Sequence, residues 1–79
     1  MILWTLHGYA DPEGAFEGGE MSCSIERAED GYRLLVEHNG EIELHESHAA
    51  IDTARGKAEF LRAELEKQGW RPVEPFHAP

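Results

Sequence analysis

Five histidines and a single cysteine are the side chains in this sequence best suited to metal binding or nucleophilic chemistry. His45 and His48 are three residues apart, and the carboxylates of Glu43 and Glu46 stand beside them. This grouping superficially resembles a zinc ligand set, but a structural zinc normally needs four ligands and there is no second spaced pair. We therefore expect no metal and no cofactor, with His45 and His48 as weak metal candidates.

Cys23 could act as a nucleophile beside a histidine, or it could be an inert core residue. It alternates with Met21 and Ile25, as residues on the buried face of a strand do. A cysteine in such a position is buried and unreactive in most cases. The sequence also has no P-loop, dinucleotide-binding fingerprint or nucleophile elbow. We therefore expect a protein that is not an enzyme.

The negative charge of the chain is confined to its first part. The formal net charge is −9, and residues 1–51 contain eleven Asp and Glu against two Arg. Residues 52–69 contain four acids and four bases. An acidic surface repels nucleic acid and anionic membranes and attracts basic proteins. We therefore expect a basic protein partner and no direct binding to nucleic acid or membrane.

The length of the chain, 79 residues, suits one small domain, 1–79, with a thin core. No apolar run approaches the length of a membrane span, and the first residues lack the basic region of a signal peptide. One cysteine allows no internal disulfide. We expect a cytoplasmic protein, and because small domains often gain stability from a partner subunit, we expect a homodimer.

Four segments alternate apolar and polar residues with the period of two that strands show. Residues 8–20, between the first two, form a long, glycine-rich acidic loop. The alternation predicts a four-stranded antiparallel meander with one apolar face, and its strands are Met1–His7, Met21–Ala28, Gly31–Glu37 and Glu41–Glu46.

The first hairpin has the turn signal Asp30-Gly31. A two-residue loop at these positions pairs Ile25 with Val36, so that apolar residues share a face of the sheet. A three-residue loop would set polar residues against the apolar ones. The sequence therefore predicts a two-residue type I′ loop.

The second hairpin carries the signal Asn39-Gly40, and the same test gives another length. A two-residue loop would pair Val36 with Glu43 on the apolar face. A three-residue loop that begins at His38 pairs Val36 with Ile42 instead. The sequence therefore predicts a three-residue loop that ends in a glycine bulge.

From about Asp52 the apolar period becomes 3.6, which predicts a helix over Asp52–Gln68 packed on one face of the sheet. Gly69 suits the left-handed residue after the helix, with Leu65 and Trp70 in contact as in a Schellman motif. The start is less marked, because either Asp52 or Ser47 could cap it. The predicted fold class is α+β, in the order β-β-β-β-α.

An extended, proline-containing tail, residues 70–79, follows the helix. Phe60 lies away from the core stripe of the helix, beside Gly56 and Ala63. Something should cover this second stripe, and the candidates are the tail and a partner.

The expected outer face of the sheet carries small and acidic residues around two leucines. We hypothesise a non-enzymatic interaction module, a small acidic accessory subunit or inhibitor that self-associates or docks on a basic protein surface, with nucleic-acid mimicry as one form of this. The alternative is a small metal- or ligand-binding protein that uses surface histidines. The candidate interaction residues are Leu3, Leu35, Glu26, Glu37, Glu41, Glu43 and Phe60.

Overall fold

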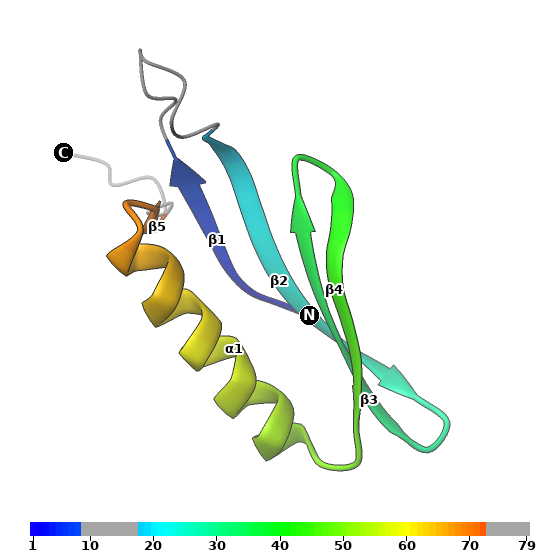
Figure 1. The fold of residues 1–79 in the computed structure, drawn as a ribbon. Helices are drawn as coiled ribbons and strands as arrows, with labels where there is room; N and C mark the ends of the chain where they lie inside the picture. Colours follow the sequence, from blue (N-terminus) through cyan, green and yellow to red (C-terminus); the bar gives the residue numbers. More distant parts are fainter. Residues whose placement is uncertain (9–17, 73–79) are drawn as a thin grey trace, which may run out of the picture.

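The computed structural model describes residues 1–8 and 18–72. They form an antiparallel sheet and one C-terminal helix, which confirms the predicted α+β class (Figure 1). A short fifth strand extends the predicted meander. The elements are β1 (Ile2–Gly8), β2 (Gly19–Ala28), β3 (Gly31–His38), β4 (Glu41–His48), α1 (Ile51–Lys67) and β5 (Arg71–Pro72).

The sheet order is β4-β3-β2-β1-β5, and α1 packs on one face of the sheet. Helix α1 starts directly after β4, crosses the sheet, and ends beside β5 at the opposite edge (Figure 1). Its distance from β4 therefore grows along its length. No helix in the described part of the chain is long and apolar enough to cross a membrane.

The core lies between the sheet and the helix. The alternation predicted for the first three strands is confirmed in their central parts, where alternate residues are buried: Trp4 and Leu6, Cys23 and Ile25, and Leu34 and Val36. Cys23 is fully buried, and burial raises the pKa of its thiol to about 11. The buried apolar residues are Trp4, Leu6, Cys23, Ile25, Leu34, Val36, Ala54, Ala58 and Trp70.

The first hairpin turns one residue earlier than predicted, and its loop is not of the predicted type I′, because neither Glu29 nor Asp30 has a positive φ. Its two loop residues are Glu29 and Asp30, and Ala28 pairs with Gly31. Gly31 is needed in the strand, because it has a φ of 151° and a Cβ there would collide with the backbone oxygen of His48. The resulting shift of the pairing is two residues, so every side chain keeps its predicted face.

The second hairpin has a two-residue loop, so the predicted three-residue loop is wrong. Asn39 and Gly40 have φ values of 52° and 86°, as a type I′ turn requires at both positions. Asn39 is also fixed from outside the hairpin, because its side-chain oxygen accepts a hydrogen bond of 2.9 Å from the Glu20 amide. The Asn39 amide donates in return to the Glu20 carbonyl oxygen.

A bulge in β4 then restores the apolar pairing that the shorter loop would have lost. Glu37 pairs with Ile42 and Val36 pairs with Leu44, which leaves Glu43 as an extra residue. The predicted faces are therefore wrong at the start of β4. Ile42 lies on the open face with 61% of its surface exposed, whereas Glu43 lies on the helix side.

A second bulge, in β1, also changes which face of the sheet the first residues of the strand occupy. Ile2 pairs with Ser24 and Trp4 pairs with Cys23, so Leu3 is the extra residue. Leu3, expected on the outer face, instead packs against the core, and Ile2 is 71% exposed.

The ends of α1 differ in how well the sequence marks them. Neither predicted cap is used at the start, since Ala50 is the N-cap and no side chain caps the helix. The predicted Schellman motif is confirmed at the end. The Trp70 amide donates to the Leu65 carbonyl oxygen at 3.1 Å, and Gly69 has a φ of 110°.

The structure describes only the ends of the predicted loop and the first residues of the predicted tail. Gly8 and Gly19 pair with each other as strand residues, and residues 9–17 lie outside the described part. In the tail, Trp70 is buried and β5 pairs with β1, while residues 73–79 lie outside the described part. Phe60 is 58% exposed, so the described tail residues leave its stripe uncovered.

Candidate binding groove

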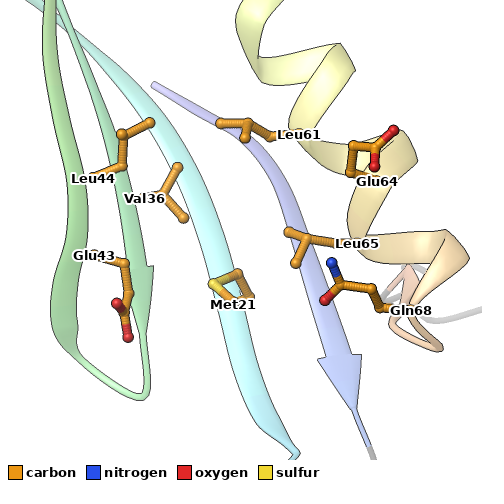
Figure 2. Close-up of a pocket in the computed structure, with 8 residues that line it drawn as sticks. All are labelled: Met21, Val36, Glu43, Leu44, Leu61, Glu64, Leu65 and Gln68. Carbon is orange, nitrogen blue, oxygen red and sulfur yellow. The ribbon is translucent and has the colours of Figure 1, made fainter.

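A groove of about 390 Å³ lies between β4 and the C-terminal half of α1. It forms where the helix has moved away from β4 on its way across the sheet (Figure 1). Figure 2 shows side chains of the sheet and of the helix facing each other across it. The lining residues are Met21, Val36, Glu43, Leu44, Leu61, Glu64, Leu65 and Gln68.

The interior of the groove is apolar. Met21 and Val36 come from the middle of the sheet, and Leu44 comes from β4 just beyond the bulge. Leu61 and Leu65 face them from the helix (Figure 2), and both are only partly buried. A partly buried apolar pocket with a few polar groups is the usual form of a binding site.

Three polar side chains complete the lining, two of them carboxylates from opposite walls. Glu43 comes from β4, Glu64 from the helix, and Gln68 lies one turn beyond Glu64 (Figure 2). The side chains of Glu43 and Glu64 are 55% and 44% exposed. An apolar surface with acidic groups at its margin favours a ligand that is apolar and cationic.

The His38 ring lies beside Glu43. The His38 Nδ1 atom is 3.4 Å from the Glu43 carboxylate, and its Nε2 atom donates to the Gly18 carbonyl oxygen at 3.1 Å. The ring also meets Trp70 edge to face, with centroids 5.5 Å apart. Glu43, which lines the groove, therefore has as its neighbour a ring that also contacts the buried Trp70.

Polar contacts join β4 to the first half of α1. The His48 ring lies 3.1 Å from the Thr53 hydroxyl and 3.0 Å from the Glu46 carboxylate. Lys57 reaches the same carboxylate from the helix at 3.8 Å. These contacts hold helix and strand together where the two are still close.

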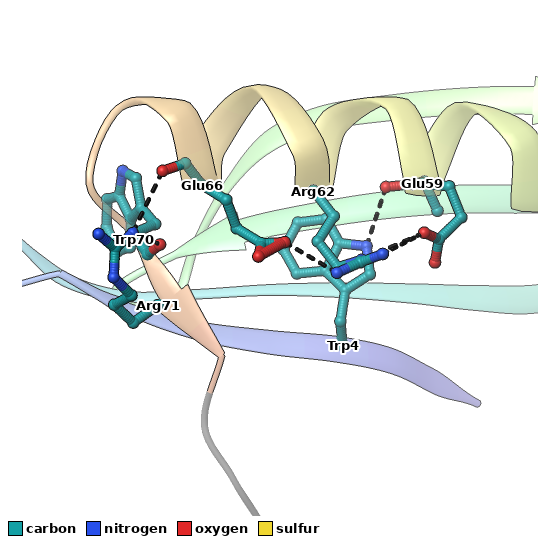
Figure 3. A network of polar contacts seen from close by, with 7 residues as sticks. Trp4, Glu59, Arg62, Glu66, Trp70 and Arg71 are labelled. Atoms are coloured by element: carbon teal, nitrogen blue, oxygen red, sulfur yellow. Dashed lines mark hydrogen bonds and ion pairs between the residues drawn. The ribbon is translucent and has the colours of Figure 1, made fainter.

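The opposite side of the helix is closed by a tryptophan. The Trp4 indole nitrogen donates a 3.0 Å hydrogen bond to the Ala58 carbonyl oxygen in the middle of α1 (Figure 3). Arg62 bridges Glu59 and Glu66 along this side. Hydrogen bonding and charge from Glu59 raise the pKa of the Arg62 guanidinium above its ordinary value.

The two metal candidates are on opposite faces of the sheet. His45 pairs with Leu35 on the open face, whereas His48 contacts the helix. Residues three apart in a strand lie on opposite faces, because strand side chains alternate. The described residues contain no group of three or more His, Cys, Asp or Glu side chains arranged to hold a metal ion.

The predicted interaction residues do not form one surface. Leu35, Glu26 and Glu37 lie on the open face, as expected from their register. Glu41 pairs with His38 near the helix side, and Glu43 lines the groove. The remaining residues occupy other places, with Leu3 against the core and Phe60 exposed on the helix.

Sequence reasoning did not predict the groove or the exposure of two isoleucines. Ile2 and Ile42 lie on the open face because of the two bulges. The signal that was present is the Asn39-Gly40 pair, which strongly favours a two-residue type I′ loop. A two-residue loop there would have required a bulge to keep Leu44 opposite Val36.

A second hollow of about 440 Å³ lies at the other end of the sheet. Polar groups dominate its lining, and Asp30 and Arg33 bring opposite charges to it. It offers no apolar interior comparable with that of the groove. The lining residues are Ala28, Asp30, Tyr32, Arg33, Ser47, His48 and Ala49.

Comparisons with known proteins add no relative from which a role could be transferred. The sequence matches no protein-family model, and neither the curated proteins nor the solved structures give a significant match. The function must therefore be argued from the geometry and charge of the groove.

Proposed function

We propose that this protein is a non-enzymatic interaction module that docks on a basic surface of a partner protein. The observation that supports it most directly is the groove, which combines an apolar interior with carboxylates on both walls. An interface with an apolar centre and a charged margin is typical of protein recognition.

The register of β4 supports a docking surface on the helix side, in place of the open face that the sequence suggested. Glu41, Glu43 and Glu46 of β4 all lie toward the helix side, and Glu64 joins them across the groove. Cations lie beside some acids on both faces, since Glu26 pairs across the strands with Arg33 on the open face, and Lys57 and Lys67 pair with Glu46 and Glu64 on the helix side. The groove side differs in that two of its acids, Glu43 and Glu64, border an apolar hollow, so it can attract a partner that is both basic and apolar.

The test is a pair of matched double charge reversals. Glu43→Lys with Glu64→Lys changes the groove, and Glu26→Lys with Glu37→Lys makes the same change of net charge on the open face. A partner isolated from the source organism should associate more slowly with the groove variant and with a weaker dependence on salt. The open-face variant should bind nearly as the natural protein does.

Two outcomes would contradict this proposal. One is association that does not depend on salt between low and physiological ionic strength. The other is a larger loss in the open-face variant than in the groove variant. Circular dichroism would verify that both variants remain folded.

Self-association is a second part of the proposal, and we place it on the outer stripe of α1. Phe60 is exposed there between Gly56 and Ala63, and Lys57 lies 5.9 Å from its ring centre. The helix carries no net charge, because its four acids and four bases balance, so two copies would not repel each other there.

Light scattering at micromolar concentration tests this part. The natural chain should show twice the monomer mass, and Phe60→Glu should return it to the monomer. Ile42→Glu, on the open face of the sheet, is the control and should leave the dimer intact. A monomer mass for the natural chain at all concentrations would exclude self-association.

A further inference from the structure

We infer that the groove between β4 and α1 receives an apolar side chain of the partner that is flanked by Lys or Arg. This inference rests on the proposed function and specifies the chemistry of the segment that binds. It follows from three features of the groove: its volume, its apolar interior and the position of its two carboxylates.

The volume and lining fit a side chain better than a whole helix or an extended sheet. About 390 Å³ is near the lower end of the range for ligand pockets. Leu44, Leu61 and Leu65 line it and are partly buried in the free protein. Covering them with an aliphatic or aromatic group removes further apolar area from water, which is the main source of affinity in such contacts.

The carboxylates are placed to pair with cations on both sides of that group. Glu43 projects from the strand wall and Glu64 from the helix wall, with the apolar residues between them (Figure 2). Basic residues before and after an apolar anchor can therefore each approach one carboxylate. Gln68, beside Glu64, adds an amide that can donate to and accept from a peptide backbone.

The present partners of these carboxylates can be exchanged. Lys67 pairs with Glu64 at 3.2 Å, but its side chain is 74% exposed. Ion pairs between exposed side chains contribute little to stability, so a partner's cation can replace this contact at small cost. His38 lies 3.4 Å from Glu43, and a cation of the partner can bind the same exposed carboxylate.

Charge also favours a basic segment of a partner over two other possible occupants of the groove, a second copy of the chain and an anionic lipid. A second copy of the chain carries a net charge of −9 and would bring further acids to the groove. An anionic lipid headgroup would be repelled for the same reason. A segment rich in Lys and Arg has the complementary charge, and its apolar residue has the complementary surface.

Three synthetic peptides of equal length test the inference with the full-length natural chain. The first has a single Leu between lysines, the second replaces this Leu by Ser, and the third keeps the Leu but replaces the lysines by Ser. Methyl NMR spectra of the protein report where each peptide binds. The reporters are the methyl groups of Leu44, Leu61 and Leu65 in the groove, with Ile2, Leu35 and Ile42 on the open face as controls.

We expect the Lys-Leu peptide to shift the groove methyl groups and to leave the open-face ones unchanged. It should bind at least about tenfold more tightly than the Ser-substituted peptide, because a buried leucine side chain gains about 1.5–3 kcal/mol. Glu43→Lys with Glu64→Lys should reduce its affinity to that of the uncharged peptide.

Each other outcome has a distinct meaning. Equal binding of the Lys-Leu and Lys-Ser peptides would overturn the inference but leave the proposed basic partner intact. Shifts confined to Ile2, Leu35 and Ile42 would likewise overturn the groove as the docking site. Equal binding of the charged and uncharged Leu peptides would contradict both the inference and the proposed function.

Discussion

The two long sides of helix α1 meet the sheet in different ways. On the side of β1, the Trp4 indole fills the space and bonds to the helix backbone at Ala58. On the side of β4, Leu44 is the facing apolar residue, and a groove remains between strand and helix. Figure 3 shows Trp4 reaching the helix on the first side, and Figure 2 shows Leu44 and Leu61 on opposite walls of the groove on the second.

This difference separates the residues that stabilise the domain from those that we propose bind a partner. The closed side buries Trp4, which contributes a large apolar area and a satisfied hydrogen bond to the core. The open side keeps leucines partly exposed beside carboxylates, an arrangement that adds less stability and suits a partner. Substitutions on the two sides should therefore have different consequences for folding and for binding.

The largest effect is expected for Trp4→Ala on the closed side. The change removes a buried indole and its hydrogen bond to Ala58, and it should lower the free energy of unfolding by about 3–5 kcal/mol. Leu44→Ala on the open side should cost only about 1 kcal/mol because Leu44 is partly buried. Urea denaturation of both variants measures the contrast, and equal losses would contradict it.

Gly31→Ala should cause the next largest loss of stability. Gly31 is the first residue of β3 and lies against His48, at the end of β4 that precedes the helix. The added Cβ would meet the His48 backbone oxygen, and the φ of 151° is unfavourable for alanine. We expect a loss of about 2–3 kcal/mol in urea denaturation. Gly56→Ala is the control, because nothing lies within 4 Å of its Cβ and alanine favours the helix. An unchanged stability of Gly31→Ala would mean that the end of β4 at His48 does not pack closely against Gly31.

Substitution of Cys23 tests whether the core around it excludes water. Cys23→Ser should cost about 1–3 kcal/mol, because it buries a hydroxyl among apolar neighbours. Burial raises the thiol pKa from 9.0 to about 11, so the folded protein holds this proton more tightly than the unfolded chain. The resulting stability is complete below pH 9 and is lost as pH rises toward 11.

The control for this pH dependence is Cys23→Ala, which retains every other group that titrates at alkaline pH. The natural chain should lose more stability than this variant between pH 8 and pH 11. A native thiol that reacts rapidly with a disulfide reagent at pH 8 would show instead that the core admits solvent.

The smallest effect on stability is expected on the open side, at the ion pair between Lys57 and Glu46. Their charged atoms are 3.8 Å apart, and both side chains are about one-third exposed. Lys57→Ala should change the free energy of unfolding by about 0.2–1 kcal/mol. A loss as large as that for Trp4→Ala would mean that polar contacts to β4, rather than the tryptophan, hold the helix on the sheet.

Several features of the fold could be predicted from local sequence alone. The alternation around Cys23 predicts a buried strand position, and the pattern from Leu65 to Trp70 predicts the helix end. Each depends on residues close together in the chain. Their geometry therefore follows from backbone preferences and hydrophobic period, with little influence from distant elements.

The candidate site depended on contacts that the sequence does not display. Glu43 and Ile42 exchange their expected faces because one extra residue in β4 reverses the alternation. That bulge forms because the tight Asn39-Gly40 turn and the pairing of Leu44 with Val36 must both be satisfied.

The sequence by itself therefore determined the class of the fold, its core periodicity and its acidic character. Only the tertiary structure decided which acids face the helix, and that α1 leaves β4 to end beside β5. The physical reason is that both depend on contacts between distant parts of the chain: the β4 register on the pairing of Leu44 with Val36, and the position of the helix on the packing of Trp4 and Trp70 in the core.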